Sequence, residues 1–138
     1  MTANTPATRK AKGRKFQQEI RDTFRRLFEG ELEIDDINCT LMSESGVDIK
    51  LTPAAKKLIP LDIECKKQQK LSIWQALAQS QENITSPERI PTLIFSRSNS
   101  KTYIVMEFDK FLNLVYPEKA KNVSDKTLKL DENSETIL

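Results

Sequence analysis

The sequence predicts an α/β domain in which a mixed central β-sheet is flanked by helices. Short segments with alternating apolar and polar residues indicate half-buried strands, and longer segments with apolar residues at three- and four-residue spacing indicate helices. The predicted order is helix, three strands, helix, two strands and helix, which indicates this fold class. With 138 residues, the chain is long enough for one domain of ordinary size.

The first predicted helix runs from Arg14 to Glu29 and is closed by Gly30. Residues 1–12 before it are expected to form a flexible basic arm. Between positions 9 and 26 the chain has eight Lys or Arg residues and only two acidic ones, which suggests a polyanionic partner. The alternative is a solvated segment that aids solubility. One helix face is apolar, formed by Phe16, Ile20, Phe24, Leu27 and Phe28.

Three short strands are predicted next, at residues 37–41, 47–51 and 61–66, and one helical turn is expected at 54–58. In the third strand, alternation places Leu61, Ile63 and Cys65 inward and Asp62, Glu64 and Lys66 outward. Cys39 also falls at an inward position. A buried, reduced thiol acts as a small apolar group, so we expect both cysteines to be reduced in an intracellular protein.

A second helix is predicted to begin after Ser72, with Gln75 completing a capping box. Trp74 in its first turn is expected in the core, and stacking on a nucleic-acid base is the alternative. Strands follow at 92–95 and 102–107, of which the second is almost wholly apolar and is expected at the sheet centre.

A short helix at 108–116 closes the predicted domain, which therefore spans residues 13–116. Residues 117–138 are polar and mixed in charge, and they are expected to form a poorly ordered tail.

Composition excludes several kinds of chemistry. The chain has no histidine, so a Ser-His-Asp triad, a Cys-His pair and any zinc site with histidine ligands are excluded. It has two cysteines, too few for a four-thiolate site. No apolar run is long enough to span a membrane, and the first eight residues lack the apolar core of a secretory signal. The location expected from these features is cytoplasmic, or the host cytoplasm for a viral protein.

Two neighbouring predicted strands place carboxylates on their polar faces, Asp48 on one and Glu64 on the other. Lys66 projects on the same side as Glu64. If these strands pair antiparallel, the two carboxylates come close together and favour a shared proton or a divalent cation. Oxygen ligands suit Mg²⁺, with Mn²⁺ able to substitute, and a nearby lysine can stabilise charge on a phosphate. The alternative is a solvated sheet face with an Asp48–Lys66 ion pair.

The segments Gly46-Val-Asp-Ile-Lys and Leu61-Asp-Ile-Glu-Cys-Lys66 resemble the metal-dependent PD-(D/E)XK nuclease superfamily. Lys12-Gly13 opening a helix with Glu19, and Ser45-Gly46-x-Asp48, are similar to archaeal Holliday-junction resolvases and to small phage-type endonucleases. The resemblance covers residues 12–111. It departs from the family pattern where Val47 replaces the motif proline, and where Gln17 stands at the spacing of the resolvases' helix glutamate.

The resemblance implies a restriction-endonuclease-like core and an Mg²⁺-dependent endodeoxyribonuclease. Asp48, Glu64 and the main-chain carbonyl of Cys65 would be its metal ligands. Lys66, and Glu19 as the nearest helix carboxylate, would complete the catalytic set. It also implies that Gln79 lines the site, that the enzyme acts in DNA recombination as a Holliday-junction resolvase, and that it is a homodimer. Other expectations are a same-fold nuclease that nicks or trims other DNA intermediates, or a catalytically silent DNA-binding module.

The partner expected from charge and resemblance is DNA, in branched form such as a four-way junction. Basic residues of the first helix and polar residues near the predicted site are expected to grip phosphates. They are Lys12, Arg14, Lys15, Arg21, Arg25, Ser43, Ser45, Lys67, Gln68 and Gln79. Apolar material for a dimer contact is available in Phe95, Tyr103, Val105 and Phe108.

Overall fold

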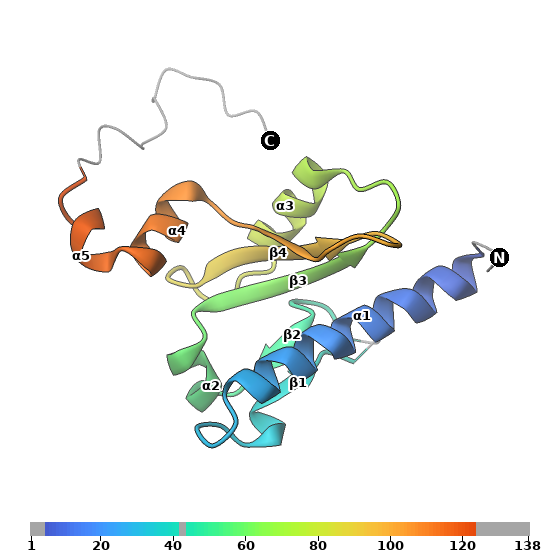
Figure 1. Cartoon of the computed structure of the whole chain (residues 1–138), viewed down its shortest axis with the longest axis horizontal. Helices are drawn as coiled ribbons and strands as arrows, with labels where there is room; N and C mark the ends of the chain where they lie inside the picture. The colour runs from blue at the N-terminus through green and yellow to red at the C-terminus, as the bar shows by residue number, and fades with distance from the viewer. Residues whose placement is uncertain (1–4, 42–43, 124–138) are drawn as a thin grey trace. The chain divides into compact units, whose positions relative to one another are not determined.

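The computed structural model describes residues 5–41 and 44–123, and its elements divide between two compact units, residues 1–105 and 106–138 (Figure 1). Within the first unit the helices are α1, α2 and α3, and the strands are β1 to β5. The helices have the bounds Pro6–Leu27, Pro53–Leu58 and Ile73–Glu82. The strands have the bounds Ile37–Cys39, Ile49–Leu51, Leu61–Lys67, Ile90–Ser96 and Tyr103–Val105. A 3₁₀ turn, η1, covers Ile34–Asp36.

Helix α1 begins eight residues earlier than the sequence pattern predicts, so residues 6–12 are helical instead of forming a flexible arm. The side chain of Thr5 accepts a hydrogen bond from the backbone N–H of Thr8 at 3.1 Å, and Pro6 occupies the first turn. Long basic side chains and alanine are good helix formers, so the charge run extends the helix. At the other end Gly30 adopts φ +89°, a conformation that favours glycine, and turns the chain.

The strands form two hydrogen-bonded groups. β1 and β2 pair antiparallel, while β3 pairs parallel with β4, which pairs antiparallel with β5. The backbone N–H of Asp48 donates to the carbonyl of Ile63 at 3.0 Å and connects the start of β2 to β3. The predicted class, α/β with mixed strand pairing and flanking helices, is therefore confirmed.

The last strand corrects a prediction. β5 lies at the end of the strand order and not at the centre, and Tyr103 and Ile104 are 54% and 53% exposed. A continuous apolar run was therefore not a sign of burial on both faces here.

Helices α1 and α3 lie on opposite sides of β3 and β4 (Figure 1). Phe16 of α1 packs in one cluster with Ile63, Cys65 and Ile94, while α3 buries Ala76 and Ser80.

Two expectations for α3 are wrong. Ser72 makes no side-chain capping bond, and Trp74 is 66% exposed instead of lying in the core. The small residues Ala76 and Ser80 let α3 approach the sheet, which turns the large aromatic side chain away.

Asp62 and Glu64 were expected to point outward, on the polar face of the strand, and both are buried. A strand that is paired in parallel and covered by helices is enclosed on both faces. Its outward-pointing side chains are therefore buried as well as its inward-pointing ones. Asp62 is held by Arg89, whose Nε lies 3.0 Å from Oδ1, and by the backbone N–H of Thr85 at 2.6 Å. Asp62 therefore has a structural role, anchoring the chain beyond α3 to β3.

The second unit contains α4 (Phe108–Val115) and α5 (Pro117–Ala120). Helix α4 begins at residue 108, where the closing helix was predicted. Residues 117–120 are helical where a poorly ordered tail was expected. Residues 124–138 of that predicted tail lie outside the described residues. Along the described ranges 5–41 and 44–123, no helix is long and apolar enough to cross a membrane.

Candidate active site

Asp48 is fixed at the junction of three strands. Its backbone N–H donates to Ile63 of β3, and its carbonyl accepts from the N–H of Thr40 at 3.0 Å. Its carboxylate accepts a hydrogen bond from the backbone N–H of Cys65, with 2.7 Å between N and Oδ2. These backbone hydrogen bonds therefore hold the carboxylate of Asp48 directly beside β3.

The hydrogen bond from Cys65 also orients a main-chain oxygen. In a strand, the N–H and C=O of one residue point toward the same edge. Since the N–H of Cys65 points at Asp48, its carbonyl lies on the Asp48 edge of β3 as well. The thiol projects from a face of the sheet into the cluster with Phe16, and burial raises its pKa.

Glu64 lies next to Asp48 and is only 2% exposed. Its Oε1 accepts a hydrogen bond from the Nδ2 of Asn83, at 2.8 Å, and the carboxyl group of Asp48 lies close enough to perturb it. Burial, together with the charge of Asp48, raises the pKa of Glu64 to about 7. Burial also raises the pKa of Asp48, against the hydrogen bond from Cys65. Both shifts favour a protonated carboxyl group in the metal-free pair.

Lys66 is near both carboxylates, and its positive charge therefore favours the ionised form of Asp48 and of Glu64. The ion pairs of the described residues do not include one between Lys66 and Asp48. The solvated ion-pair alternative does not describe this arrangement, since Glu64 is buried and Lys66 lines a cleft.

These residues fit a hard divalent cation by their donor chemistry. Two adjacent carboxylates repel each other unless a proton or a cation is shared, and the carbonyl of Cys65 faces the same edge. Among the residues that the structure describes, no group of three or more His, Cys, Asp or Glu side chains could hold a metal. A site with two carboxylates and one carbonyl would leave its other positions to water and substrate, as Mg²⁺ prefers.

Asn83 is a site residue that sequence reasoning missed. Gln79 was expected to line the site, but its side chain is exposed, and the polar contact to Glu64 comes from one helical turn further along. Residues four apart share a helix face. The prediction therefore chose a residue of the same helix face as Asn83, but one turn too early. Asn83 lies at the carboxyl-terminal cap of α3, beyond the last helical residue.

Glu19 is exposed, and the structure does not bring it to the carboxylate pair. A cavity of about 280 Å³ lies between α1 and Asp48, and Gln17 and Arg14 line it from the helix. Gln17 and Glu19 are two residues apart and so point about 200° apart. Glu44 lines the same cavity and is the additional carboxylate near Asp48 that the motif comparison did not indicate.

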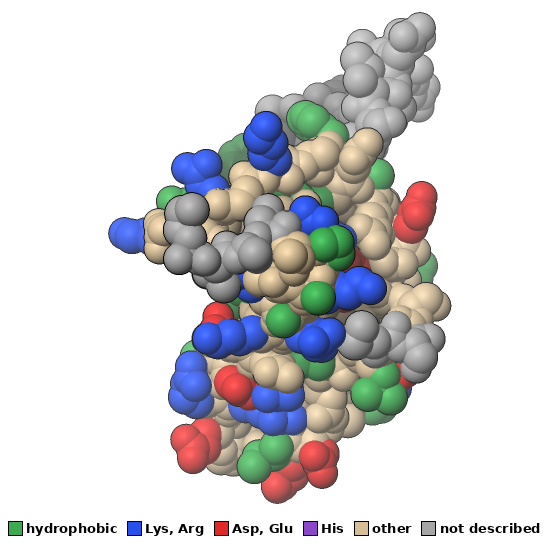
Figure 2. Space-filling view, turned by 90° about the vertical axis from the view of Figure 1, so that its right-hand side faces the viewer, with side chains coloured by type: hydrophobic (Ala, Val, Ile, Leu, Met, Phe, Trp, Pro, Cys, Tyr) green, Lys and Arg blue, Asp and Glu red, His purple; other side chains and the backbone are tan. Residues whose placement is uncertain are grey.

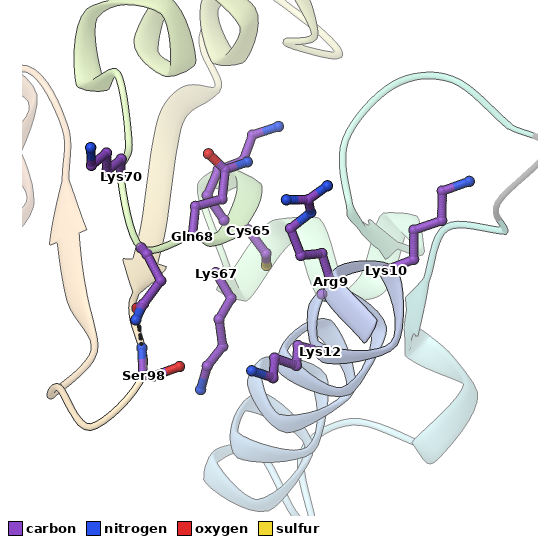
Figure 3. Close-up of a pocket in the computed structure, with 11 residues that line it drawn as sticks. Arg9, Lys10, Lys12, Cys65, Lys67, Gln68, Lys70 and Ser98 are labelled. Carbon is purple, nitrogen blue, oxygen red and sulfur yellow. Dashed lines mark hydrogen bonds between the residues drawn. The ribbon is translucent and has the colours of Figure 1, made fainter. Parts of the chain in front are cut away.

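A larger cleft, of about 680 Å³, opens between the first turns of α1 and the end of β3 (Figure 3). Figure 2 shows Lys and Arg side chains gathered across the face toward which the amino-terminal end of α1 points. Lys12, Lys67 and Gln68, expected to bind DNA, line this cleft. Lys67 also places its ammonium 5.7 Å from the ring centroid of Phe16.

Arg21 and Arg25 were expected to contact phosphates, but both make hydrogen bonds within the protein. Arg25 donates from Nε to the carbonyl of Ile37 and from Nη2 to Oδ1 of Asn38, both at 2.9 Å. Arg21 donates to Asp22 at 2.9 Å. Both guanidinium groups are half-buried, because α1 lies against β1 and uses these side chains in that contact.

The remaining predicted DNA contacts are dispersed. Lys15 is exposed on α1, and Ser45 lines a separate cavity of about 250 Å³ together with Asn83. Ser43 lies outside the described residues. Of the basic residues of α1, Lys10 and Arg14 line the cavity that Asp48 also lines, while Arg9, Lys10 and Lys12 line the cleft that contains Lys66.

Compared with protein-family models, with curated proteins and with solved structures, the chain has no match.

Proposed function

We propose that this protein is a metal-dependent DNA endonuclease of the PD-(D/E)XK type with a restriction-endonuclease-like core. The observation that carries the proposal is the carboxylate pair of half-buried Asp48 and buried Glu64, with Lys66 beside it at the rim of a basic cleft. A structural carboxylate pair gains nothing from mutual repulsion, whereas a cation-binding pair uses it to gain affinity for the cation.

Asp48, Glu64 and the carbonyl of Cys65 would hold Mg²⁺, or Mn²⁺ in its place. When bound, the cation supplies Lewis-acid stabilisation of the charge on a scissile phosphate. The N–H of Cys65 fixes the carboxylate of Asp48, and Asn83 fixes that of Glu64. Lys66 orients the attacking water or offsets the charge that grows on the phosphate. The cleft lysines hold the backbone without reading bases.

The substrate we propose is branched DNA, most specifically a four-way junction, cut by a homodimer in the cytoplasm. Junction resolution needs two symmetric cuts, and one chain supplies one carboxylate pair. A same-fold nuclease that nicks or trims other intermediates uses the same site, and a catalytically silent DNA-binding module would keep the cleft alone. Cleavage of four-way junction, duplex, flap and single-stranded DNA, tested in parallel with Mg²⁺, separates these functions.

The site assignment is tested by removing one negative charge at a time. We expect Asp48→Asn and Glu64→Gln to abolish Mg²⁺-dependent cleavage while leaving DNA binding intact, because each removes a cation ligand and no phosphate contact. Cleavage is measured on labelled junctions, and binding by fluorescence anisotropy in EDTA. The matched control is Glu82→Gln, an exposed residue of α3 that should cleave like the parent. Near-parental cleavage by either site variant would contradict the assignment.

A further inference from the structure

The basic cleft has two opposed walls. Arg9, Lys10 and Lys12 lie on the α1 wall, and Lys66, Lys67 and Lys70 lie on the wall formed by β3 and the segment after it (Figure 3). No described Asp or Glu lines it. The second wall is braced by the turn between β4 and β5, where the N–H of Ser98 donates to Oε1 of Gln69 at 2.9 Å.

Because cationic side chains lie on two opposed walls, the cleft favours a polyanion that is narrow enough to contact both walls. In a duplex, each backbone has its bases and the second strand on its inner side, so a protein reaches phosphates from the outside only. A cleft of about 680 Å³ is too small to enclose a duplex, so both of its walls can contact the same backbone only when a single strand enters between them. A basic groove that follows one backbone is characteristic of single-strand binding.

The second independent observation is exposed aromatic surface on the two elements that follow the cleft-lining residues Lys70 and Ser98 along the chain. Trp74 is 66% exposed and follows Lys70 by four residues, in the first turn of α3. Tyr103 is 54% exposed and lies on β5, after the turn that contains Ser98. Large aromatic side chains exposed next to a basic groove provide faces on which unpaired bases stack.

We propose that this cleft binds one single-stranded nucleic-acid segment, with a base stacked on Trp74. The inference takes nucleic acid as the ligand from the proposed function and adds that the bound form is unpaired. For a branched substrate, the cleft would take the strand that leaves the duplex near the carboxylate pair.

The chain contains a single tryptophan, so its fluorescence reports on Trp74 alone. The protein is titrated with a short oligothymidylate, with a blunt duplex of equal length and with heparin, all in EDTA. We expect saturable quenching by the oligothymidylate, with an affinity at least about tenfold higher than for the duplex. Heparin should compete for the cleft without quenching, because it has no bases to stack. Equal or tighter duplex binding, or no quenching by the single strand, would overturn the proposal.

Variants on the two walls test the location. Lys12→Ala and Lys70→Ala should each weaken oligothymidylate binding and reduce the slope of log K against log salt by about 0.7 for each phosphate that the removed ammonium neutralises. The control is Lys57→Ala, which removes an exposed lysine of α2 that does not line the cleft. An equal effect of all three variants would mean that binding follows net charge and not the cleft.

Trp74→Ala should weaken single-strand binding by about 5- to 150-fold and leave duplex binding unchanged, while Trp74→Phe should retain part of the affinity. Anisotropy of a labelled strand measures both variants, and an unchanged affinity of Trp74→Ala would remove the stacking role. Single-strand binding without cleavage of any DNA would contradict the nuclease proposal and support this one. Cleavage without single-strand binding would do the reverse.

Discussion

Glu64 is buried beneath α3, with a second carboxylate beside it and the side-chain amide of Asn83 as its hydrogen-bond donor. One amide donor does not compensate for burial and for the charge of Asp48, so the pKa of Glu64 rises to about 7. In the unfolded chain the pKa returns to its ordinary value near 4.5. Between these two values the folded protein binds more protons than the unfolded one.

The metal-free protein should therefore lose stability as pH rises from 5 to 8. The raised pKa of Glu64 favours the folded state below its unfolded pKa, and this contribution disappears as pH passes the folded value. We expect the free energy of unfolding to fall by up to about 3 kcal/mol over this range, measured by urea denaturation in EDTA. Carboxyl groups with lowered pKa, such as Asp36, are ionised in both states above pH 5 and do not contribute.

The control for this prediction is Glu64→Gln, which removes the titrating group and nearly preserves its shape. Its stability should change little between pH 5 and 8, and at pH 8 it should exceed that of the parent. A parent protein whose stability rises over the same range would mean that the carboxylate pair is already compensated in the metal-free state.

At this scale the sequence was informative about residue types and less so about their partners. Alternation and motif spacing placed Asp48, Glu64 and Lys66 together, because strand geometry fixes which side chains share an edge. They did not show that Asp62 pairs with Arg89, since that ion pair joins β3 to residues beyond α3. Asn83 was missed for the same reason: its contact with Glu64 depends on how α3 lies on the sheet.

Helix α1 is the element in which sequence and structure differ most. Its apolar stripe was predicted correctly at Phe16, Ile20, Phe24 and Phe28, which repeat at helical spacing and pack in the core cluster. Leu27 was expected in the same stripe but is 67% exposed, because it lies in the last turn of the helix. The beginning of the helix was not predicted correctly, because a run of basic residues suits both a solvated arm and a charged helix. Arg25 was expected to grip phosphates, whereas its side chain reaches across to β1.

The contact between Arg25 and β1 gives a prediction about stability. Arg25→Ala removes two charge-assisted hydrogen bonds and leaves the carbonyl of Ile37 without this donor. We expect the free energy of unfolding to fall by about 1–3 kcal/mol, measured by urea denaturation. Arg26→Ala, at the exposed neighbouring position, should change it by less than about 0.5 kcal/mol. Equal effects of the two variants would show that Arg25 contributes charge alone.

The whole molecule consists of two compact units, each with apolar surface exposed to solvent. In the first unit, β5 ends the strand order, and within the described residues no strand pairs with its outer edge. In the second, α4 buries none of its described side chains, and Phe108 and Phe111 are exposed. An exposed edge strand and an apolar helix face are both surfaces on which a second copy can be accommodated.

We expect a homodimer of about 32 kDa, twice the 15.8 kDa of one chain, joined antiparallel through the edge of β5. Light scattering at micromolar concentration, with and without junction DNA, measures this mass. Ile104→Lys places a charge on the edge and should give a monomer, whereas Phe111→Lys should remain dimeric. Dissociation by Phe111→Lys alone would move the interface to α4, and a parent that is monomeric in both conditions would exclude paired cutting.

The cleft between α1 and β3 also affects the protein when nothing is bound. Folding brings six cationic side chains of this cleft together with no described carboxylate among them, so their mutual repulsion raises the free energy of the native state. Dissolved salt screens this repulsion and therefore stabilises the fold. The same salt competes with a polyanion for the cleft and weakens the complex. Ionic strength consequently acts in opposite directions on the two properties, and the concentration that best preserves the purified protein is not the one at which it binds best.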